Sequence, residues 1–122
     1  PIHVDGSNIR TYIYTKDFSN ALEAVFNKGE DGEIYNIGTS DEISNLSLAK
    51  LILKKLGKDE NYMEFVKDRP FNDKRYSLEL KKIKSLGWNP QYSFEQALDE
   101  TIRWYKENKN WWKDKTSENV KK

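Results

Sequence analysis

The sequence contains no cysteine and a single histidine, His3, among its 122 residues. The lack of cysteine excludes disulfide bonds and thiolate nucleophiles, and the single histidine excludes a zinc site built from those two ligand types. No apolar run approaches the roughly 18 residues needed to span a bilayer, and no signal-peptide pattern opens the chain. The sequence therefore predicts a soluble, cytoplasmic protein with no metal site and no contact with a membrane.

Neither sign of charge is in excess, because Lys+Arg 21 against Asp+Glu 20 leaves a net charge of +1. Nucleic-acid-binding surfaces need clustered cations, and here the cations are spread along the chain, so nucleic acid is not an expected partner. Hydrophobic residues make up 36% and aromatic residues 13%, which is typical of one small domain with an aromatic-rich core. We expect one domain over residues 1–112 and a charged, frayed tail at 113–122.

Four short segments have the β-branched and aromatic content of strands: residues 1–4, 9–15, 32–38 and 62–66. In the second of these, Arg10, Tyr12 and Tyr14 alternate with apolar residues, which is the period of a strand. Three of the four lie beside glycines or turn residues. Short strands interleaved with helices predict an α/β fold.

About four helices are expected, because apolar residues recur at helical spacing behind four residues that favour N-caps. These proposed caps are Asp17, Asn45, Ser77 and Ser93. Glycines at positions 29, 57 and 87 end the first three helices, and Gln96 completes a capping-box pattern at the fourth. Trp88, just after the third helix, is expected in the core.

Residues 68–76, with the sequence Asp-Arg-Pro-Phe-Asn-Asp-Lys-Arg-Tyr, concentrate charged groups behind the last predicted strand. Pro70 fixes one φ angle and pushes Arg69 toward an extended conformation, which presents the guanidinium from a stiff backbone. A planar guanidinium binds phosphate through two parallel charge-assisted hydrogen bonds, and stiffness lowers the cost of ordering it. The segment is either an anion-binding loop or a solvated loop with a surface Asp–Arg pair.

Taken together, six blocks of the chain resemble the C-terminal part of nucleotide-sugar 4,6-dehydratases. In chain order they are Pro1-Ile2-His3, Asp5-Gly6-Ser7-Asn8-Ile9-Arg10, Tyr14-x-x-Asp17, Gly32-Glu33-Ile34-Tyr35-Asn36-Ile37-Gly38, Asp68-Arg69-Pro70-x-Asn72-Asp73-x-Arg75-Tyr76 and Leu86-Gly87-Trp88-x-Pro90. These enzymes are extended short-chain dehydrogenase/reductases that oxidise glucose C4 with bound NAD, eliminate water across C5 and C6, and return the hydride to C6. The resemblance implies the substrate-binding C-terminal part of that fold, without the NAD-binding Rossmann half.

The resemblance also implies which residues contact a nucleotide-diphosphate sugar. The implied set is Pro1, Ile2, His3, Arg10, Asn45, Arg69 and Asn72. By it, Arg10 and Arg69 hold the diphosphate. Residues 1–3 and Asn45 lie along the nucleoside, and Asn72 reaches the ribose. From the residues alone, a solvent-facing strand arginine is the favoured reading of Arg10, and a helix cap is the favoured reading of Asn45, which is compatible with a ligand contact.

The loop also bears on the choice of base. Asp73, Arg75 and Tyr76 are expected to order the loop rather than to contact ligand. Phe71-Asn72 stands where bacterial dTDP-type dehydratases typically show Gly-His, whereas plant UDP-glucose 4,6-dehydratase domains show Arg-Pro-Phe-Asn-Asp. The resemblance therefore favours UDP-glucose, with dTDP-glucose next. The alternatives are part of a related nucleotide-sugar epimerase or decarboxylase, and a non-catalytic nucleotide-sugar-binding module.

The sequence does not match the superfamily's catalytic Tyr-x-x-x-Lys pair or its glycine-rich dinucleotide fingerprint. Tyr12 and Lys16 have the spacing of the superfamily's catalytic Tyr-x-x-x-Lys pair, but that pair needs a helix, where i and i+4 lie one above the other. Both are expected on a strand entering a turn, so no catalytic residue is assigned. The glycines are too sparse to form a dinucleotide fingerprint. We therefore expect a fragment that is inactive alone, cut from a homodimeric enzyme whose other half binds the NAD.

Overall fold

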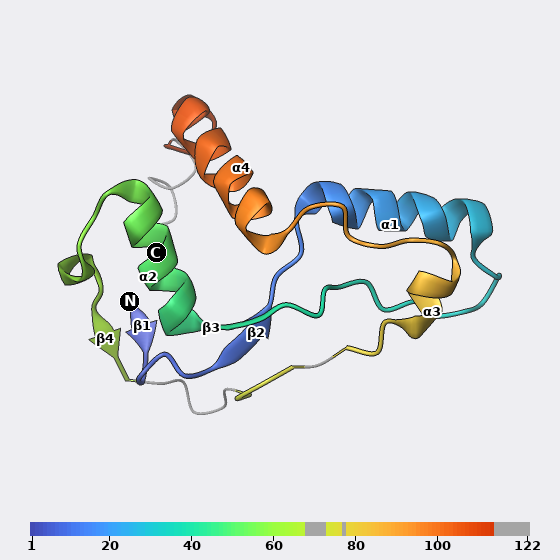
Figure 1. Ribbon diagram of the computed structural model, residues 1–122, viewed down its shortest axis with the longest axis horizontal. Coiled ribbons are helices and arrows are strands. Elements are labelled where there is room, and N and C mark those ends of the chain that lie inside the picture. The colour runs from blue at the N-terminus through green and yellow to red at the C-terminus, as the bar shows by residue number, and fades with distance from the viewer. Residues whose placement is uncertain (68–72, 77, 114–122) are drawn as a thin grey trace. The chain divides into compact units, whose positions relative to one another are not determined.

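The computed structural model describes residues 1–67, 73–76 and 78–113 (Figure 1). Its elements are β1 (Ile2–His3), β2 (Ile9–Thr11), α1 (Thr15–Lys28), β3 (Glu42–Ser44), α2 (Asn45–Leu56), the 3-10 turn η1 (Glu60–Tyr62), β4 (Phe65–Val66), α3 (Lys81–Ser85) and α4 (Phe94–Glu107). The chain divides into two compact units, Pro1–Gln91 and Tyr92–Lys122. The expected α/β class is confirmed. Within the described ranges, no helix has the length and apolar character that crossing a membrane requires.

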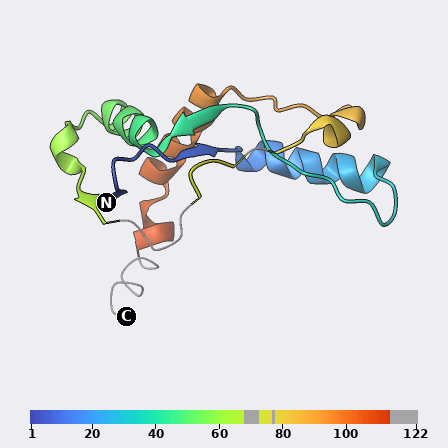
Figure 2. The same ribbon diagram turned by 90° about the horizontal axis from the view of Figure 1, so that it is seen from below.

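Two strand pairings organise the first unit. β1 runs parallel to β4, with Ile2 opposite Phe65. β2 and β3 lie side by side and antiparallel, with Ile9 opposite Ser44 (Figure 2). An isolated parallel bridge joins Ile9 to Arg75, which adds a further segment to β2. β2 therefore connects the start of α2 with the chain that follows residue 72.

The strands are shorter than the sequence suggested, and one expected strand is missing. Residues 32–38 form no strand with any described part of the chain, although their composition is right, because a strand also needs a partner for its backbone hydrogen bonds. β2 ends at Thr11 rather than Thr15, and the last strand begins at Phe65. β3 was not expected, since three residues are too few for an alternating pattern to be recognised.

The core of the first unit lies where α1 meets α3. Ala21 and Ile83 are fully buried, and Leu80 and Trp88 are almost so. The prediction that Trp88 belongs to the core is confirmed. The partly buried side chains that pack against this cluster are Ile13, Ala24, Val25, Tyr35, Ile37 and Leu86.

The apolar residues of α1 divide between two faces. Ala21 is buried and Val25 packs against the core, whereas Phe18 is 39%, Leu22 51% and Phe26 89% exposed. The last three recur every fourth residue and so form one exposed stripe.

Asp17 is not the N-cap of α1. The helix begins two residues earlier, behind Tyr14, which offers no side-chain cap. Asp17 instead lies in the first turn and is 1% exposed. Its carboxylate accepts a hydrogen bond from the backbone N–H of Gln91 at 2.9 Å, and its carbonyl accepts one from the Trp88 indole at 3.2 Å. It therefore fixes the chain that leaves α3.

The other helix ends follow the sequence more closely. Gly57 ends α2 in the left-handed region at φ 66°, as expected. α3 begins only at Lys81 behind Leu80, later than predicted, and the proposed cap Ser77 lies outside the described residues. Gly29 follows α1 directly.

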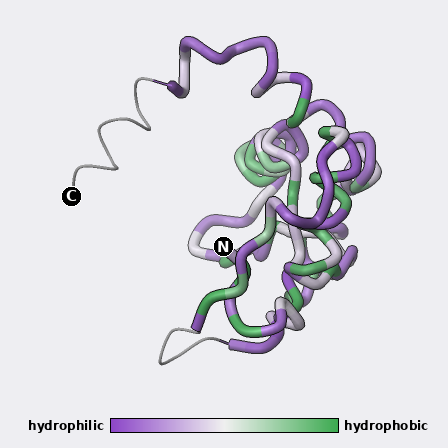
Figure 3. Tube along the Cα trace, turned by 90° about the vertical axis from the view of Figure 1, so that its left-hand side faces the viewer, coloured by the Kyte–Doolittle hydropathy of each residue, from purple (hydrophilic) through white to green (hydrophobic). Residues whose placement is uncertain are grey.

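The second unit begins with the predicted capping box. The Gln96 N–H donates to Ser93 Oγ at 3.3 Å, and the Ser93 N–H donates to Gln96 Oε1 at 3.0 Å, which starts α4. After α4, a helical turn at 109–113 packs the Trp111 ring edge to face against the Trp104 ring, with 5.1 Å between the ring centroids. Figure 3 shows mostly hydrophilic colours along the tube that leads into the grey C-terminal trace. The tail expected at 113–122 stays a prediction.

Candidate functional site

Pro1, Ile2 and His3 lie beside the chain that enters the 68–72 segment. The Ile2 N–H donates to the Glu64 carbonyl at 2.6 Å, and His3 Nδ1 lies 3.3 Å from the Lys67 carbonyl oxygen. Pro1 is exposed, and Ile2 and His3 are half-buried. Parallel pairing with β4 therefore holds Ile2 beside Phe65 and His3 beside Val66 and Lys67.

The N-terminus of α2 is docked onto the turn that follows β1. The Leu46 N–H donates to the Gly6 carbonyl at 3.0 Å, and the Asn45 N–H donates to the Asn8 carbonyl at 3.0 Å. Ser44 Oγ accepts from the Ser47 N–H at 3.1 Å. The first three backbone donors of this helix thus have protein acceptors, so any phosphate would be held by cationic side chains rather than by this helix end.

Asn45 is the first residue of α2 and not its cap, because Ser44 performs that role. A serine hydroxyl reaches the N3 amide from the preceding position, which leaves the Asn45 side chain available for other contacts. Its Oδ1 accepts a hydrogen bond from the Tyr12 hydroxyl at 3.3 Å. Because Ser44 pairs with Ile9, this places Asn45 beside β2.

Arg10 on β2 contacts the chain immediately after the 68–72 segment. Its NH2 donates to the Asp73 carbonyl at 2.7 Å, and its NH1 donates to the carbonyls of Ile9 at 2.7 Å and Lys74 at 3.4 Å. The guanidinium carbon lies 4.7 Å from the centroid of the Tyr76 ring. Arg10 is therefore oriented by one short segment, residues 73–76.

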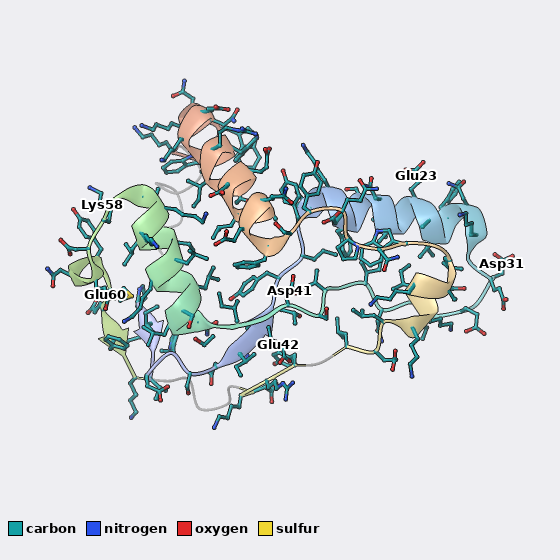
Figure 4. The ribbon with its side chains drawn as sticks, in the orientation of Figure 1. Glu23, Asp31, Asp41, Glu42, Lys58 and Glu60 are labelled. Carbon is teal, nitrogen blue, oxygen red and sulfur yellow. The ribbon has the colours of Figure 1, made fainter. Side chains whose placement is uncertain are left out.

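That segment is attached to the β2–β3 pair at two further points. The Ile9 N–H donates to the Lys74 carbonyl at 2.8 Å. Arg75 binds Glu42 on β3 through two hydrogen bonds, from Nε to Oε1 at 2.7 Å and from NH2 to Oε2 at 2.8 Å. Figure 4 labels Glu42, whose side chain lies on the side of β3 that faces this segment. Hydrogen bonds to Glu42 and the charge of its carboxylate raise the pKa of Arg75. Both ends of the arrangement therefore rest on the β2–β3 pair.

The structure brings part of the predicted set together. Arg10 lies on β2, Asn45 lies beside β2 at the start of α2, and His3 lies beside Lys67. Arg69 and Asn72 lie outside the described residues, in sequence between Lys67 and Asp73. The roles assigned to all seven residues stay predictions.

Tyr12 and Lys16 do not share a helix. Tyr12 lies between β2 and α1, Lys16 lies in the first turn of α1, and Lys16 Nζ is 5.9 Å from the centroid of the Tyr14 ring. Lys16 is thus on a helix rather than on a turn, which corrects the expectation for that residue. The stacked arrangement of a helical Tyr-x-x-x-Lys pair is not formed.

The described residues do not fit a metal or a dinucleotide. In the ranges 1–67, 73–76 and 78–113, no three His, Asp or Glu side chains are grouped so as to hold a metal ion. α1 starts behind Tyr14 rather than behind a glycine-rich turn, and the first amides of α2 already have acceptors. Neither α1 nor α2 therefore begins as a dinucleotide-binding helix does.

Glu42 is the residue that sequence reasoning missed. It stands in a polar connection where no strand was expected, so nothing marked it as the partner of Arg75. Arg75 bonds Glu42 and Tyr76 bonds Asp73, while the expectation that Asp73, Arg75 and Tyr76 order the loop stays a prediction. The pairing of Thr11 on β2 with Glu42 on β3 brings the Glu42 carboxylate within reach of Arg75, and the sequence alone does not show this pairing.

Comparison with known proteins gives a consistent result. The family model for GDP-mannose 4,6-dehydratase matches residues 2–101. The trifunctional UDP-glucose 4,6-dehydratase/UDP-4-keto-6-deoxy-D-glucose 3,5-epimerase/UDP-4-keto-L-rhamnose-reductase of Arabidopsis thaliana is 47% identical over 115 residues, which cover 93% of this chain and 17% of the plant protein.

Two bacterial structures have similar folds. The dTDP-glucose 4,6-dehydratase of Streptomyces venezuelae, solved with NAD bound, is 42% identical with a TM-score of 0.87, over 92% of this chain and 35% of that one. The UDP-glucose 4-epimerase of Thermotoga maritima, solved with UDP-glucose, is 31% identical with a TM-score of 0.75, over 87% and 35%. The chain therefore spans about a third of each bacterial enzyme.

Proposed function

The chain belongs to the GDP-mannose 4,6-dehydratase family, within the extended short-chain dehydrogenase/reductase fold, and from this premise we propose that it is the nucleotide-sugar-binding portion of an NAD-dependent NDP-glucose 4,6-dehydratase. The enzyme would form an NDP-4-keto-6-deoxyglucose. The observation that carries the proposal is the position of Arg10, a cation ordered by residues 73–76 within a chain that resembles such enzymes over nine-tenths of its length.

In this proposal Arg10 and Arg69 bind the diphosphate of the substrate. A diester-like diphosphate carries two negative charges, and two guanidinium groups neutralise them through charge-assisted hydrogen bonds. Residues 1–3 and Asn45 contact the nucleoside, and Asn72 contacts the ribose. The residues of this chain thus bind and orient the sugar nucleotide, while the reacting groups come from the rest of the enzyme.

NAD belongs, in this proposal, to the part of the enzyme outside the 122 residues, where it accepts and returns a hydride. The support is that the Streptomyces enzyme was solved with NAD, and that α1 and α2 of this chain do not begin behind a glycine-rich turn. The proposal further includes a homodimeric enzyme in the cytoplasm. Sedimentation of the purified enzyme and fractionation of cells would test these two points.

UDP-glucose is the proposed substrate ahead of dTDP-glucose. The support is the Phe71-Asn72 pair and the 47% identity with a plant UDP-glucose 4,6-dehydratase, against 42% with a bacterial dTDP-glucose enzyme. Steady-state kinetics on the enzyme that contains this chain should give the higher kcat/KM with UDP-glucose. A clear preference for dTDP-glucose would overturn this part of the proposal and leave the dehydratase assignment intact.

The experiment for the binding role removes the arginines one at a time. In the enzyme that contains this chain, Arg10→Ala or Arg69→Ala should weaken UDP binding by about 1.5–3 kcal/mol, the scale of a hydrogen bond to a charged group. Lysine at either position should restore only part of it, because an ammonium cannot form the bidentate contact. Arg103→Ala on α4, an exposed arginine paired with Glu100, is the matched control and should change nothing. Calorimetry with UDP measures all of them, and unchanged affinity in both arginine variants would refute the role.

A nucleotide-sugar epimerase is the second candidate, because the chain is also similar to the Thermotoga epimerase, at lower identity. Product mass separates the two reactions directly. A dehydratase releases one water, so its product is lighter than UDP-glucose, whereas an epimerase product is an isomer of the same mass. Incubation of the enzyme with UDP-glucose followed by mass spectrometry would decide between them.

A further inference from the structure

Tyr76 is a described residue to which the proposed function assigns no role. Its ring lies under the Arg10 guanidinium, 4.7 Å from ring centroid to guanidinium carbon. The ring is half exposed, at 50%, and Arg10 is half-buried. Guanidinium groups stack on aromatic faces through both charge and planarity, so the ring restricts the plane of Arg10.

Asp73 links these two side chains. Its backbone carbonyl accepts from Arg10 NH2 at 2.7 Å, and its carboxylate accepts from the Tyr76 hydroxyl. One residue therefore fixes the edge of the guanidinium and the far end of the ring that supports it. Arg10, Asp73 and Tyr76 thus contact one another in a closed triangle that we call the Arg10 support.

The Arg10 support is itself anchored on both sides. Ile9, next to Arg10, donates its N–H to the Lys74 carbonyl at 2.8 Å, and Arg75, next to Tyr76, binds Glu42 through two hydrogen bonds. The triangle is thus tied to the strand that carries Arg10 and to the neighbouring strand. Rotation of the Arg10 side chain would have to break contacts within this frame.

We propose that Tyr76 is a positioning residue for Arg10, an inference that rests on the proposed diphosphate contact of Arg10. A free arginine side chain loses substantial rotamer freedom when it is fixed on a ligand, and prior fixing lowers that cost. Tyr76 raises affinity for the diphosphate without touching it. The Asp73 carboxylate supports the same effect by holding the Tyr76 hydroxyl.

The test measures UDP and uridine binding by calorimetry in the enzyme that contains this chain. Tyr76→Leu removes the ring and should weaken UDP binding about two- to fivefold, the scale of an exposed cation–aromatic contact, with uridine binding unchanged. Tyr76→Phe keeps the ring and loses only the Asp73 contact, so its effect should be smaller. Tyr62→Leu is the matched control, because Lys58 Nζ lies 5.0 Å over the Tyr62 ring at the far end of α2.

A double variant separates positioning from a general structural effect. In the Arg10→Ala background, Tyr76→Leu should cause no further loss of UDP affinity, because the group that it positions is gone. A further loss of the same size would overturn the inference, as would an unchanged affinity in Tyr76→Leu alone. If Arg10→Ala itself leaves UDP binding unchanged, the proposed function of Arg10 fails, which is a separate outcome. Should Tyr76→Leu not fold, Tyr76→Phe with and without Arg10→Ala gives the same comparison at smaller amplitude.

Discussion

Asp17 is a buried residue that joins two distant parts of the first unit through hydrogen bonds. It is 1% exposed, and through its side chain and its carbonyl it holds Gln91 and the Trp88 indole. These contacts join the first turn of α1 to the chain that leaves α3. A buried carboxylate is costly unless its hydrogen bonds are made, so this joint depends on correct partners.

Asp17→Ala should lower the free energy of unfolding by about 2–3 kcal/mol, since it leaves the Gln91 amide without its acceptor and opens a small cavity. Urea denaturation followed by circular dichroism measures the change. Asp31→Ala is the control: Asp31 is exposed, as Figure 4 also shows, and its loss should cost less than about 0.5 kcal/mol. Equal effects of the two substitutions would contradict the role given to Asp17.

Asp5 gives a pH dependence of known sign. Hydrogen bonds from Ser7, including its N–H at 2.9 Å, hold the pKa of Asp5 below its ordinary value. The folded chain therefore takes up this proton less readily than the unfolded chain. The resulting stabilisation is complete above about pH 4 and is lost as the pH falls through the folded pKa.

The prediction is that Asp5→Asn removes this part of the acid dependence. The difference in unfolding free energy between pH 7 and pH 3 should be smaller in Asp5→Asn than in the unchanged chain. Denaturation at the two pH values gives the comparison. The same difference in both proteins would show that the turn at residues 5–7 does not discriminate between the two protonation states.

At the scale of elements, Gly6 permits α2 to dock against β1. It is buried, has φ 72°, and a Cβ there would meet Ile2 Cγ2 and Leu46 Cβ, each at 2.8 Å. Gly32 has a similar φ of 81° but nothing within 4 Å. Substitution at Gly6 therefore tests close packing together with backbone strain, whereas substitution at Gly32 tests backbone strain alone.

Gly6→Ala should lower the free energy of unfolding by about 2–4 kcal/mol, the sum of left-handed strain and overpacking. Gly32→Ala should cost only the strain, about 1–2 kcal/mol. Thermal or urea denaturation measures both. A cost for Gly32→Ala as large as that for Gly6→Ala would mean that contact with Ile2 and Leu46 is unimportant.

The elements also show what the sequence could and could not predict. α4 was predictable, because its capping box is written in four consecutive residues beginning at Ser93. The start of α1 was not, since Asp17 looks like a cap but is needed elsewhere by Gln91, 74 positions away. Local chemistry sets helix ends only where no distant partner competes for the same side chain.

The candidate site was predictable in part. Arg10 was singled out by resemblance and by its place on a strand, and the structure places it on β2 beside Tyr76. The Arg75–Glu42 pair was not foreseeable, because a three-residue strand such as β3 leaves no periodic signal. Nothing in the composition says that residues 33 positions apart become neighbours.

At the scale of the whole molecule, α1 carries an exposed apolar stripe that does not pack against the core cluster of the first unit. Phe18, Leu22 and Phe26 face away from the side that holds Ala21 and Val25. Exposed apolar patches favour association. We therefore expect the 122-residue chain to self-associate at high concentration through this face.

Phe26→Lys should weaken that self-association, because it places a charge on a face that would be buried. Sedimentation velocity over a concentration series measures the effect. Tyr62→Lys is the control, since Tyr62 is similarly exposed, at 67%, and lies outside the stripe. An unchanged association constant in Phe26→Lys would exclude the α1 stripe as the contact.

The 122-residue chain alone, given NAD and UDP-glucose, should form no 4-keto-6-deoxy product. Oxidation at C4 needs a hydride acceptor and a base positioned together, and elimination needs an acid and a base near C5 and C6. Mass spectrometry of the reaction mixture checks this, with the enzyme that contains the chain as positive control. Product from the chain alone would mean that residues of this chain, Tyr12 and Lys16 first, are catalytic.

The attachment of residues 73–76 to β2 also determines when the binding arrangement can appear during folding. Arg10 and Asp73 are 63 positions apart, whereas helices α1 and α2 are built from neighbouring turns. Closing a long loop costs entropy before the contact returns free energy, so distant pairings lag behind local ones. After dilution from denaturant, helical dichroism should recover first and the capacity to bind a nucleotide should recover last.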